Sequence, residues 1–232
     1  MTATESQSFA TNLDLTEEQE LIRETVRRFA EEVIAPHARR HDEAKSFNEA
    51  AWAQMCELGL PGLPFPEEVG GAGMDTLAYI IAVEELARVC ASTALSYAAH
   101  VSLGTYPIYA WGREALKERY LERLCSGEYM GAYGLTEPDA GSDSGGTRTT
   151  AVEDGDHFVL NGSKCFITNG SYAKTFVCTA QTDRSLGNKG IMAIVVDRDT
   201  PGFSIEPGEE KLGMRASDWT SLVFQDCRVP KG

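Results

Sequence analysis

The stretch Tyr133-Gly134-Leu135-Thr136-Glu137-Pro138-Asp139-Ala140-Gly141-Ser142-Asp143 decides how this chain folds. Its polar side chains do not fit a core strand, and its glycines and proline do not fit a helix interior. They fit a loop whose backbone N–H groups and hydroxyls turn outward to hold an anionic group. An EF-hand calcium loop is excluded, because Ser144 stands where glycine is required and Thr150 where glutamate is required. A solvated acidic turn remains an alternative to a ligand loop.

One ligand that suits this loop is a flavin dinucleotide. On that interpretation Thr136 hydrogen-bonds the edge of the isoalloxazine ring. The backbone amides of Gly141 and Ser142 face the pyrophosphate, where glycine permits a close approach. Glu137 and Asp139 are poor neighbours for a phosphate, so we expect them to shape the turn or to bond to the backbone.

A second candidate segment is Phe166-Ile167-Thr168, which ends at the dipeptide Asn169-Gly170. An aromatic residue at this position is ordinarily part of the core. Its place before a hydroxyl and a tight turn also suits stacking on a planar ring, with Thr168 donating to a ring nitrogen. The pattern alone leaves both alternatives open.

The chain before Met130 has a helical pattern. Thr16-Glu17-Glu18-Gln19 is a capping box, and we expect the helix behind it to end at Pro36. Asp75 is the expected N-cap of a helix with an apolar stripe that includes Leu77 and Ile80. Further helices are predicted over residues 48–58, 91–104 and 114–124, with a loop over 61–73.

The chain after Met130 has the pattern of strands and turns. Asp154-Gly155, Asn161-Gly162 and Asn169-Gly170 are interpreted as hairpin turns. Strands are predicted over residues 147–153, 157–160, 164–168, 176–180, 191–197 and 221–225. The fold class is therefore α+β: an all-α N-terminal domain followed by an antiparallel β-barrel or sandwich. The predicted divisions are a flexible tail over residues 1–12, a helical domain over 13–129 and a β domain over 130–232.

Composition excludes several classes of partner. The net charge of −14, from 35 acidic and 21 basic residues, argues against nucleic acid and against an anionic membrane surface. The six cysteines form no C-x-x-C pair and indicate buried thiols in a reducing, cytoplasmic compartment. No secretory signal or membrane-spanning stretch is expected. His37 and His41 share a helix face, but the arginines between them indicate a solvated helix end rather than a metal site.

Nucleotide-binding glycine motifs are not matched. Gly70-Gly71-Ala72-Gly73 lacks a preceding strand, and Thr76 stands where a dinucleotide fingerprint requires glycine. The stretch is interpreted as a loop between helices.

A third motif, Lys211-Leu212-Gly213-Met214-Arg215-Ala216-Ser217-Asp218, joins the first two in a family resemblance. From about Leu15 to its end the chain resembles the acyl-CoA dehydrogenase family, including the Leu60–Gly73 pattern and the final strand Phe224–Pro230. The resemblance implies noncovalent FAD. The residues it assigns to FAD are Tyr133, Leu135, Thr136, Gly141, Ser142, Phe166, Ile167 and Thr168.

The resemblance also implies a reaction. Phe166 takes the place of an aromatic residue, often tryptophan, that packs against the flavin, and Ser142 falls where the family contacts acyl-CoA. The family removes an α-proton with a carboxylate while the β-hydride passes to flavin N5, as in fatty acid β-oxidation. An electron-transfer flavoprotein takes the electrons, and the enzymes are homotetramers. Overall likeness favours short-chain or branched acyl groups.

One part of the family pattern has no match in this chain. The glutamate base of the family lies in a C-terminal helical domain, so no catalytic residue is predicted here and this chain alone is expected to be inactive. A fragment of a longer enzyme is favoured over a separate subunit. Two alternatives stay open: a noncatalytic subunit that binds acyl-CoA or a partner, and an acyl-CoA oxidase or nitroalkane-oxidising enzyme of the same fold. The segment 95–103, with Tyr97 and His100, either faces an acyl tail or packs as an ordinary helix.

Overall fold

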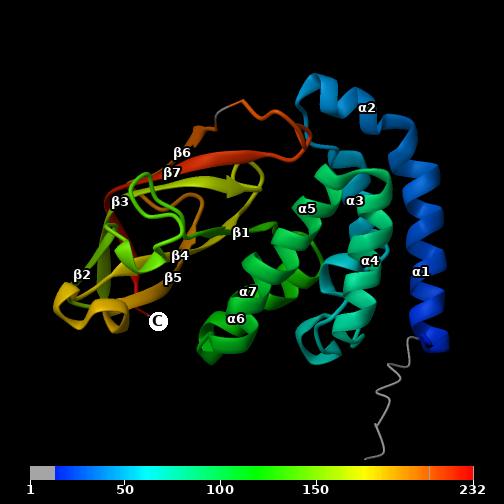
Figure 1. The fold of residues 1–232 in the computed structure, drawn as a ribbon. Helices are drawn as coiled ribbons and strands as arrows, with labels where there is room; N and C mark the ends of the chain where they lie inside the picture. The colour runs from blue at the N-terminus through cyan, green and yellow to red at the C-terminus, as the bar shows by residue number, and fades with distance from the viewer. Residues whose placement is uncertain (1–13, 209, 232) are drawn as a thin grey trace, which may run out of the picture.

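The computed structural model describes residues 14–208 and 210–231, so the tail predicted over residues 1–12 lies outside the described part. Helices occupy one side of the molecule and a curled sheet the other (Figure 1). The last α-helix ends at Cys125 and the first strand begins at Gly131. The division into domains at residue 130 remains a prediction. The helices are α1 (Glu17–Phe29), α2 (Ala35–Ala44), α3 (Glu49–Glu57), α4 (Thr76–Val89), α5 (Ala91–Ala99), α6 (Tyr106–Trp111) and α7 (Glu114–Cys125).

The first helix begins as its sequence predicts. The Thr16 hydroxyl accepts from the Gln19 backbone N–H at 3.2 Å, and the Gln19 side chain accepts from the Thr16 N–H at 3.0 Å. The Asp75 cap of α4 is confirmed as well, since its carboxylate accepts from the Ala78 N–H at 2.7 Å. Both signals lie within four residues, so they depend little on the rest of the fold.

The prediction that Pro36 ends the first helix is wrong. A π-helical segment, Ala30–Ile34, follows α1, and Pro36 lies in the first turn of α2. A second π-helical segment, His100–Thr105, is likewise followed by an α-helix, α6, with Pro107 in its first turn. The helix predicted over residues 91–104 therefore continues beyond its predicted end. The change from π to α geometry begins a new first turn, in which a residue without an N–H breaks no helical hydrogen bond.

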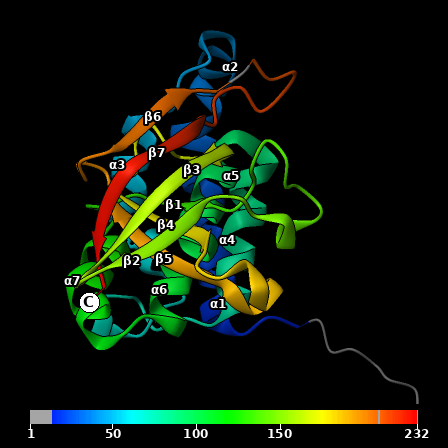
Figure 2. The same ribbon diagram turned by 90° about the vertical axis from the view of Figure 1, so that its left-hand side faces the viewer.

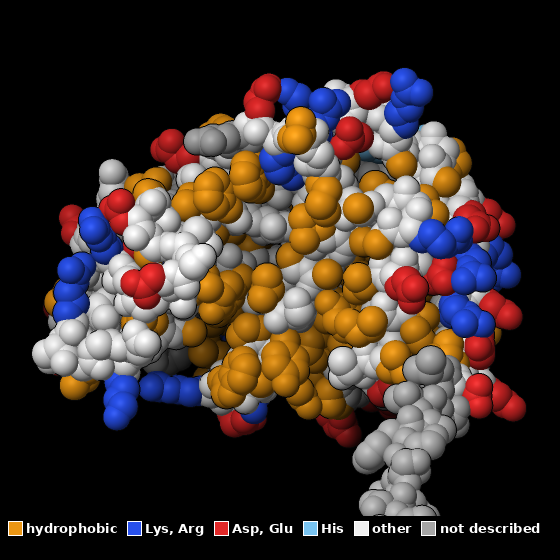
Figure 3. All heavy atoms as spheres, viewed as in Figure 1, with side chains coloured by type: hydrophobic (Ala, Val, Ile, Leu, Met, Phe, Trp, Pro, Cys, Tyr) orange, Lys and Arg blue, Asp and Glu red, His pale blue; other side chains and the backbone are white. Residues whose placement is uncertain are grey.

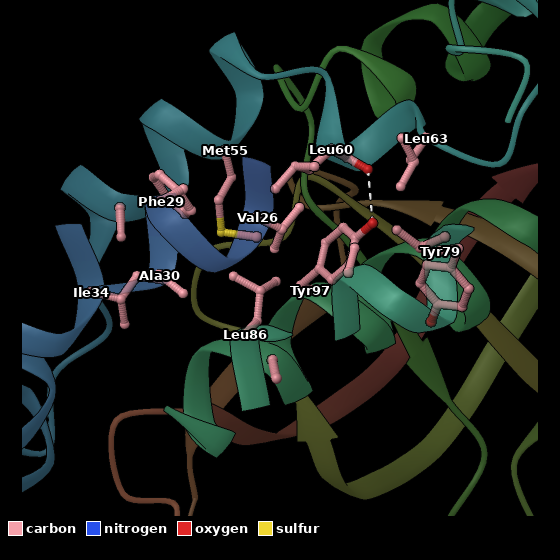
Figure 4. Close-up of a cluster of buried hydrophobic side chains, with 14 of the residues drawn as sticks. Val26, Phe29, Ala30, Ile34, Met55, Leu60, Leu63, Tyr79, Leu86 and Tyr97 are labelled. Carbon is pink, nitrogen blue, oxygen red and sulfur yellow. Dashed lines mark hydrogen bonds between the residues drawn. The ribbon is translucent and has the colours of Figure 1, made fainter. Parts of the chain in front are cut away.

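The helical half has an apolar core made by α1, α3, α4 and α5 (Figure 4). At its centre Tyr97 is fully buried and donates its hydroxyl to the Leu60 carbonyl at 3.1 Å. The apolar stripe predicted on α4 is only partly buried. Ile81 and Leu86 face the core, whereas Leu77 and Ile80 remain about half exposed.

The β half is one curled seven-stranded sheet (Figure 2). Strand order is β1-β4-β2-β3-β7-β6, and β5 pairs with β4. Pairing is antiparallel as predicted, except that β1 runs parallel to β4 and β2 meets β4 in one parallel pair. The strands are β1 (Gly131–Gly134), β2 (Thr150–Asp154), β3 (His157–Thr168), β4 (Thr175–Gln181), β5 (Ile191–Asp197), β6 (Phe203–Pro207) and β7 (Trp219–Pro230).

Two of the three predicted hairpin turns are turns in the structure. Gly155 lies in the β2–β3 turn, and Asn169 adopts a left-handed φ of 67° after β3. Asn161-Gly162 is not a hairpin: it lies within β3 at a shift of register against β7, with Gly162 at φ 145°. The Asn161 side-chain amide exchanges two hydrogen bonds with Asp226. At this point two residues of β7, Gln225 and Asp226, face the single residue Asn161, so the irregularity is a bulge in β7 and β3 continues through the glycine.

A close backbone contact joins the two halves. A Cβ on Gly104, in the second π segment, would lie 2.6 Å from the Gly131 carbonyl carbon, so this position requires glycine. The fully buried His100 bridges the same seam: its Nε2 lies 3.0 Å from the Leu124 carbonyl, and its Nδ1 accepts from the Gly131 N–H at 3.0 Å. This contact sets where β1, and the loop after it, leave the helical half.

Several findings bear on the expectations from composition. None of the six cysteines is in a disulfide; Cys125, Cys178 and Cys227 are buried as predicted, whereas Cys56, Cys90 and Cys165 are only partly buried. Within residues 14–208 and 210–231, no cluster of three His, Cys, Asp or Glu side chains has the geometry to hold a metal ion. None of the helices in that part of the chain is long and apolar enough to cross a membrane.

Candidate functional site

A cleft of about 220 Å³ lies where the helical half meets the sheet. One wall comes from the end of β1 and the loop that follows, and the adjoining wall from the end of β3, whose Cys165 N–H donates to the Thr136 carbonyl at 2.8 Å. The floor comes from Ala99 and Leu103. Figure 3 shows apolar side chains gathered across this middle region of the molecular surface, which is hollowed between the two halves. Six of the eight residues predicted to contact FAD line the cleft: Tyr133, Leu135, Thr136, Phe166, Ile167 and Thr168.

Phe166 does not take the role of an ordinary core residue. Its side chain is 54% exposed, and its ring stacks on Trp219 with centroids 4.8 Å apart. Its backbone φ is +62°, at a register shift between β3 and β7. A left-handed φ costs a bulky residue about 1–2 kcal/mol, and such strain is concentrated at functional sites. The bulge therefore turns an aromatic face toward the cleft at a cost in stability.

Two hydroxyls on the cleft walls are available for a ligand. Thr136 and Thr168 both line the cleft, and each is partly buried. Throughout the described ranges, neither hydroxyl has a hydrogen-bond partner in the protein. Partly buried hydroxyls without partners, beside an exposed aromatic face, fit a planar polar ring such as isoalloxazine.

Gly141 and Ser142 do not line the cleft. They lie on the exposed part of the loop, beyond a tight turn in which Glu137 and Ala140 exchange backbone hydrogen bonds of 3.0 and 3.2 Å. No atom lies within 4 Å of the position that a Cβ on Gly141 would take. A group much longer than the ring would be needed to reach both the cleft and this loop, as a dinucleotide is. Their predicted pyrophosphate and acyl-CoA contacts remain predictions.

The acidic residues of the loop bond to the protein, as the sequence led us to expect. Glu137 is buried, and its carboxylate accepts from the backbone N–H groups of Arg148 at 2.6 Å and Thr149 at 3.1 Å. Asp139 pairs with the Arg148 guanidinium at 2.8 Å. Neither carboxylate is free to repel a phosphate.

Lys164, the partner of Glu137, was not among the residues predicted from the sequence. Its ammonium lies 2.7 Å from Glu137 Oε1, and the side chain is completely buried. Burial raises the pKa of Glu137, but hydrogen bonds from Lys164 and Thr149, and from the backbone amides, more than offset this and hold the pKa below its ordinary value. A buried lysine has no signature in a strand pattern, because lysine is almost always exposed.

The segment 95–103 was predicted either to face an acyl tail or to pack as an ordinary helix, and its residues differ in this respect. Tyr97 and His100 pack inside the protein and do not face the cleft, whereas Ala99 and Leu103 do. The third motif supports the cleft from outside it. Lys211 donates to the Met214 carbonyl at 2.7 Å and lies over the Trp219 ring at 5.6 Å. The Ser217 hydroxyl meets that of Ser96 at 3.2 Å.

Comparison with known protein families matches almost the whole chain. Residues 16–128 match the model described as "Acyl-CoA dehydrogenase, N-terminal domain", and residues 132–227 match "Acyl-CoA dehydrogenase, middle domain". A curated relative, the short-chain specific acyl-CoA dehydrogenase of Clostridium acetobutylicum, is 52% identical over 219 residues. That alignment covers 94% of this chain and 58% of the relative, so the chain spans less than two thirds of the relative's length.

Solved structures give the same result. Butyryl-CoA dehydrogenase from Megasphaera elsdenii superposes with a TM-score of 0.91 and 41% identity, over 94% of this chain and 58% of that one. A second solved structure superposes with a TM-score of 0.93. It is described as "Electron transferring flavoprotein of Acidaminococcus fermentans: Towards a mechanism of flavin-based electron bifurcation". Its identity is 44%, over 95% of this chain and 58% of that one.

Proposed function

The chain belongs to the acyl-CoA dehydrogenase family, and from this premise we propose that it binds FAD and serves the α,β-dehydrogenation of an acyl-CoA thioester. The observation that carries the proposal is the meeting of six predicted contact residues in one cleft, with an exposed, conformationally strained Phe166 and two hydroxyls without partners. A cleft with these features fits a planar ring with polar edges better than it fits a solvated turn.

The residues present define how the cofactor would be held. The Thr136 and Thr168 hydroxyls would hydrogen-bond the edge of the ring, and the aromatic side chain of Phe166 would pack against its face. The amides of Gly141 and Ser142 bind the pyrophosphate, and Ser142 also contacts the acyl-CoA. When bound, the flavin supplies a two-electron acceptor for hydride from the substrate. These contacts of the protein would orient the ring.

The proposal also covers the acyl substrate, the protein partners and the cellular compartment. The relative named as short-chain specific and the butyryl-CoA enzyme support a short acyl chain. An electron-transfer flavoprotein would take the electrons in the context of fatty acid β-oxidation, and the working enzyme would be a homotetramer. Six cysteines without a disulfide between them support a cytoplasmic location. A carboxylate base is required, and none of the carboxylates that we have described is assigned to it.

The direct test is purification of the natural full-length protein. We expect a yellow protein with the absorption spectrum of bound FAD, which bleaches when butyryl-CoA is added without oxygen. Oxygen consumption without an electron-transfer protein would indicate an oxidase instead. Butyryl-CoA binding without bleaching would indicate a noncatalytic subunit. A colourless protein that does not take up added FAD would contradict the proposal.

A further inference from the structure

Lys164 lies directly behind the cleft wall and uses its whole hydrogen-bonding capacity there. Its ammonium donates to Glu137 Oε1 at 2.7 Å, to Thr179 Oγ1 at 3.0 Å and to the Leu135 carbonyl at 3.2 Å. A lysine has three donors, so none is left over. The side chain comes from β3, and its acceptors come from β4 and from the loop after β1.

Glu137 gathers a second set of bonds at the same centre. In addition to Lys164, its carboxylate accepts from the backbone N–H groups of Arg148 and Thr149, which precede β2. The pair therefore ties together the loop after β1, the approach to β2, and strands β3 and β4. Both side chains are buried, so water does not compete for these bonds.

The effect is that four consecutive residues are held from behind the cleft. Thr179 donates to the Gly134 carbonyl at 3.4 Å, Lys164 to that of Leu135, and the Cys165 N–H to that of Thr136 at 2.8 Å. Glu137 is held through its side chain. The front of the same segment presents Leu135 and Thr136 to the cleft.

The adjoining wall, at the end of β3, is attached to the same centre. Lys164 stands two residues before Phe166 on β3, immediately ahead of the register shift that turns Phe166 outward. We propose that Lys164 and Glu137 are positioning residues, which set the spacing and orientation of the two cleft walls and hence the affinity for the flavin ring. The inference rests on the proposed function for the identity of that ring.

A requirement for stability alone does not account for the charges. Burying an ion pair costs desolvation, and apolar residues of similar volume often serve as well or better. An apolar pair, however, has no donor for the Leu135 carbonyl. The charged pair is therefore suited to fix a backbone segment in one place.

The decisive variant is Lys164→Met with Glu137→Gln in the natural full-length protein. Glutamine retains an oxygen that accepts from the Arg148 or Thr149 N–H, and no charge is left unpaired. We expect a folded protein whose dissociation constant for FAD rises about ten- to a hundredfold, the scale of a hydrogen bond to a charged group. The visible circular dichroism of bound FAD should change as well. Unchanged affinity and dichroism in the folded double variant would overturn the inference.

A matched control removes an exposed ion pair from the same sheet. Arg228 on β7 pairs with Asp154 on β2, away from the cleft. Arg228→Met with Asp154→Asn should leave the affinity for FAD unchanged. A loss of affinity equal to that of the buried double variant would mean that any change to the sheet weakens binding, and would contradict a special role for Lys164 and Glu137.

Two further measurements keep the inference testable. If the buried double variant does not fold, Thr179→Val removes one acceptor of Lys164, and should weaken FAD binding about tenfold or less; wild-type affinity would count against the inference. If the natural protein binds no FAD, the proposed function fails, but the walls remain measurable. The emission of Trp219, with every other tryptophan of the protein replaced by phenylalanine, should then shift in the double variant, because Trp219 stacks on Phe166. Unchanged emission would overturn the inference.

Discussion

Among the residues that the structure describes, each half of the molecule buries one glutamate, and the two are held in different ways. In the helical half Glu85 accepts from Arg27 at 2.9 and 2.6 Å and from Arg88 at 3.3 Å. The side chains of these arginines remain 46 and 47% exposed. In the β half Glu137 is paired with Lys164, whose side chain is 0% exposed. The first arrangement joins α1 to α4 at the water boundary, whereas the second lies in the dry interior.

The difference shows what a buried charge contributes in each place. The helical half is positioned by apolar packing, so its charges need only satisfy one carboxylate near the surface. The loop after β1 has little apolar packing of that kind, because apart from Leu135 and Ala140 its residues are mostly glycine, proline and polar side chains. Directional bonds from a buried ammonium hold it instead. The following predictions test this contrast, beginning with the largest expected effect.

The largest effect should come from Lys164→Met alone. Glu137 would stay buried without its charged partner, and we expect a loss of about 3–5 kcal/mol in the free energy of unfolding at pH 7. The pKa of Glu137, lowered in the wild type, should rise in this variant because burial then dominates. The difference in the free energy of unfolding between wild type and variant should therefore become smaller as the pH falls from 7 toward 4. Urea denaturation at several pH values measures this, and a difference that does not depend on pH would contradict it.

The seam between the two halves should give the next effect, through His100. Complete burial lowers the pKa of His100 to about 4, against a smaller opposite influence of its bond to Leu124. An unfolded histidine takes up its proton near pH 6.5. Between these values unfolding takes up a proton, so stability is fully present above about pH 6.5 and falls by roughly 3 kcal/mol toward pH 4. His100→Gln should lose this slope, and equal slopes for the two proteins between pH 6.5 and 5 would refute the prediction.

A smaller loss is expected for Glu85→Gln. The amide keeps part of the bonding to the arginines, whose exposed guanidinium groups recover water, so we expect about 1–2 kcal/mol at pH 7. Hydrogen bonds from Arg27 lower the pKa of Glu85 despite its burial, so the wild-type contribution is present above about pH 4.3 and lost below it. Arg39→Ala, which breaks an exposed pair with Glu43, is the control and should have no measurable effect. A loss for Glu85→Gln as large as that for Lys164→Met would remove the contrast between the halves.

The smallest effect on stability should come from Phe166→Gly, although this residue lies in the cleft. Relief of the left-handed φ offsets the lost stacking on Trp219, so stability should stay within about 1 kcal/mol of the wild type. Affinity for FAD should nevertheless fall, on the order of tenfold, because the aromatic face is gone. Thermal unfolding and FAD titration of the same samples separate the two quantities. A large loss of stability would show that Phe166 is a core residue after all.

Much of the cleft was predictable because its signals are local. The Thr16 box and the Asp75 cap are set by atoms within one helical turn, and both form. The segments around Thr136 and Phe166 were recognised by turn chemistry and by family resemblance, and the structure brings them to the same cleft. The end of the first helix was not predictable, because a π turn upstream of Pro36 leaves no mark in the spacing of apolar residues.

By itself, the sequence determined the order of helices before strands, the main caps, and the family of the chain, because these depend on periodicity and on short contiguous motifs. Only the tertiary structure decided that Asn161-Gly162 lies within β3 opposite a bulge in β7, that His100 joins the halves, and that Lys164 is buried against Glu137. These three outcomes depend on which strand or helix lies alongside. Burial turns a polar side chain from a surface group into a structural bond, and burial is a property of the assembled chain.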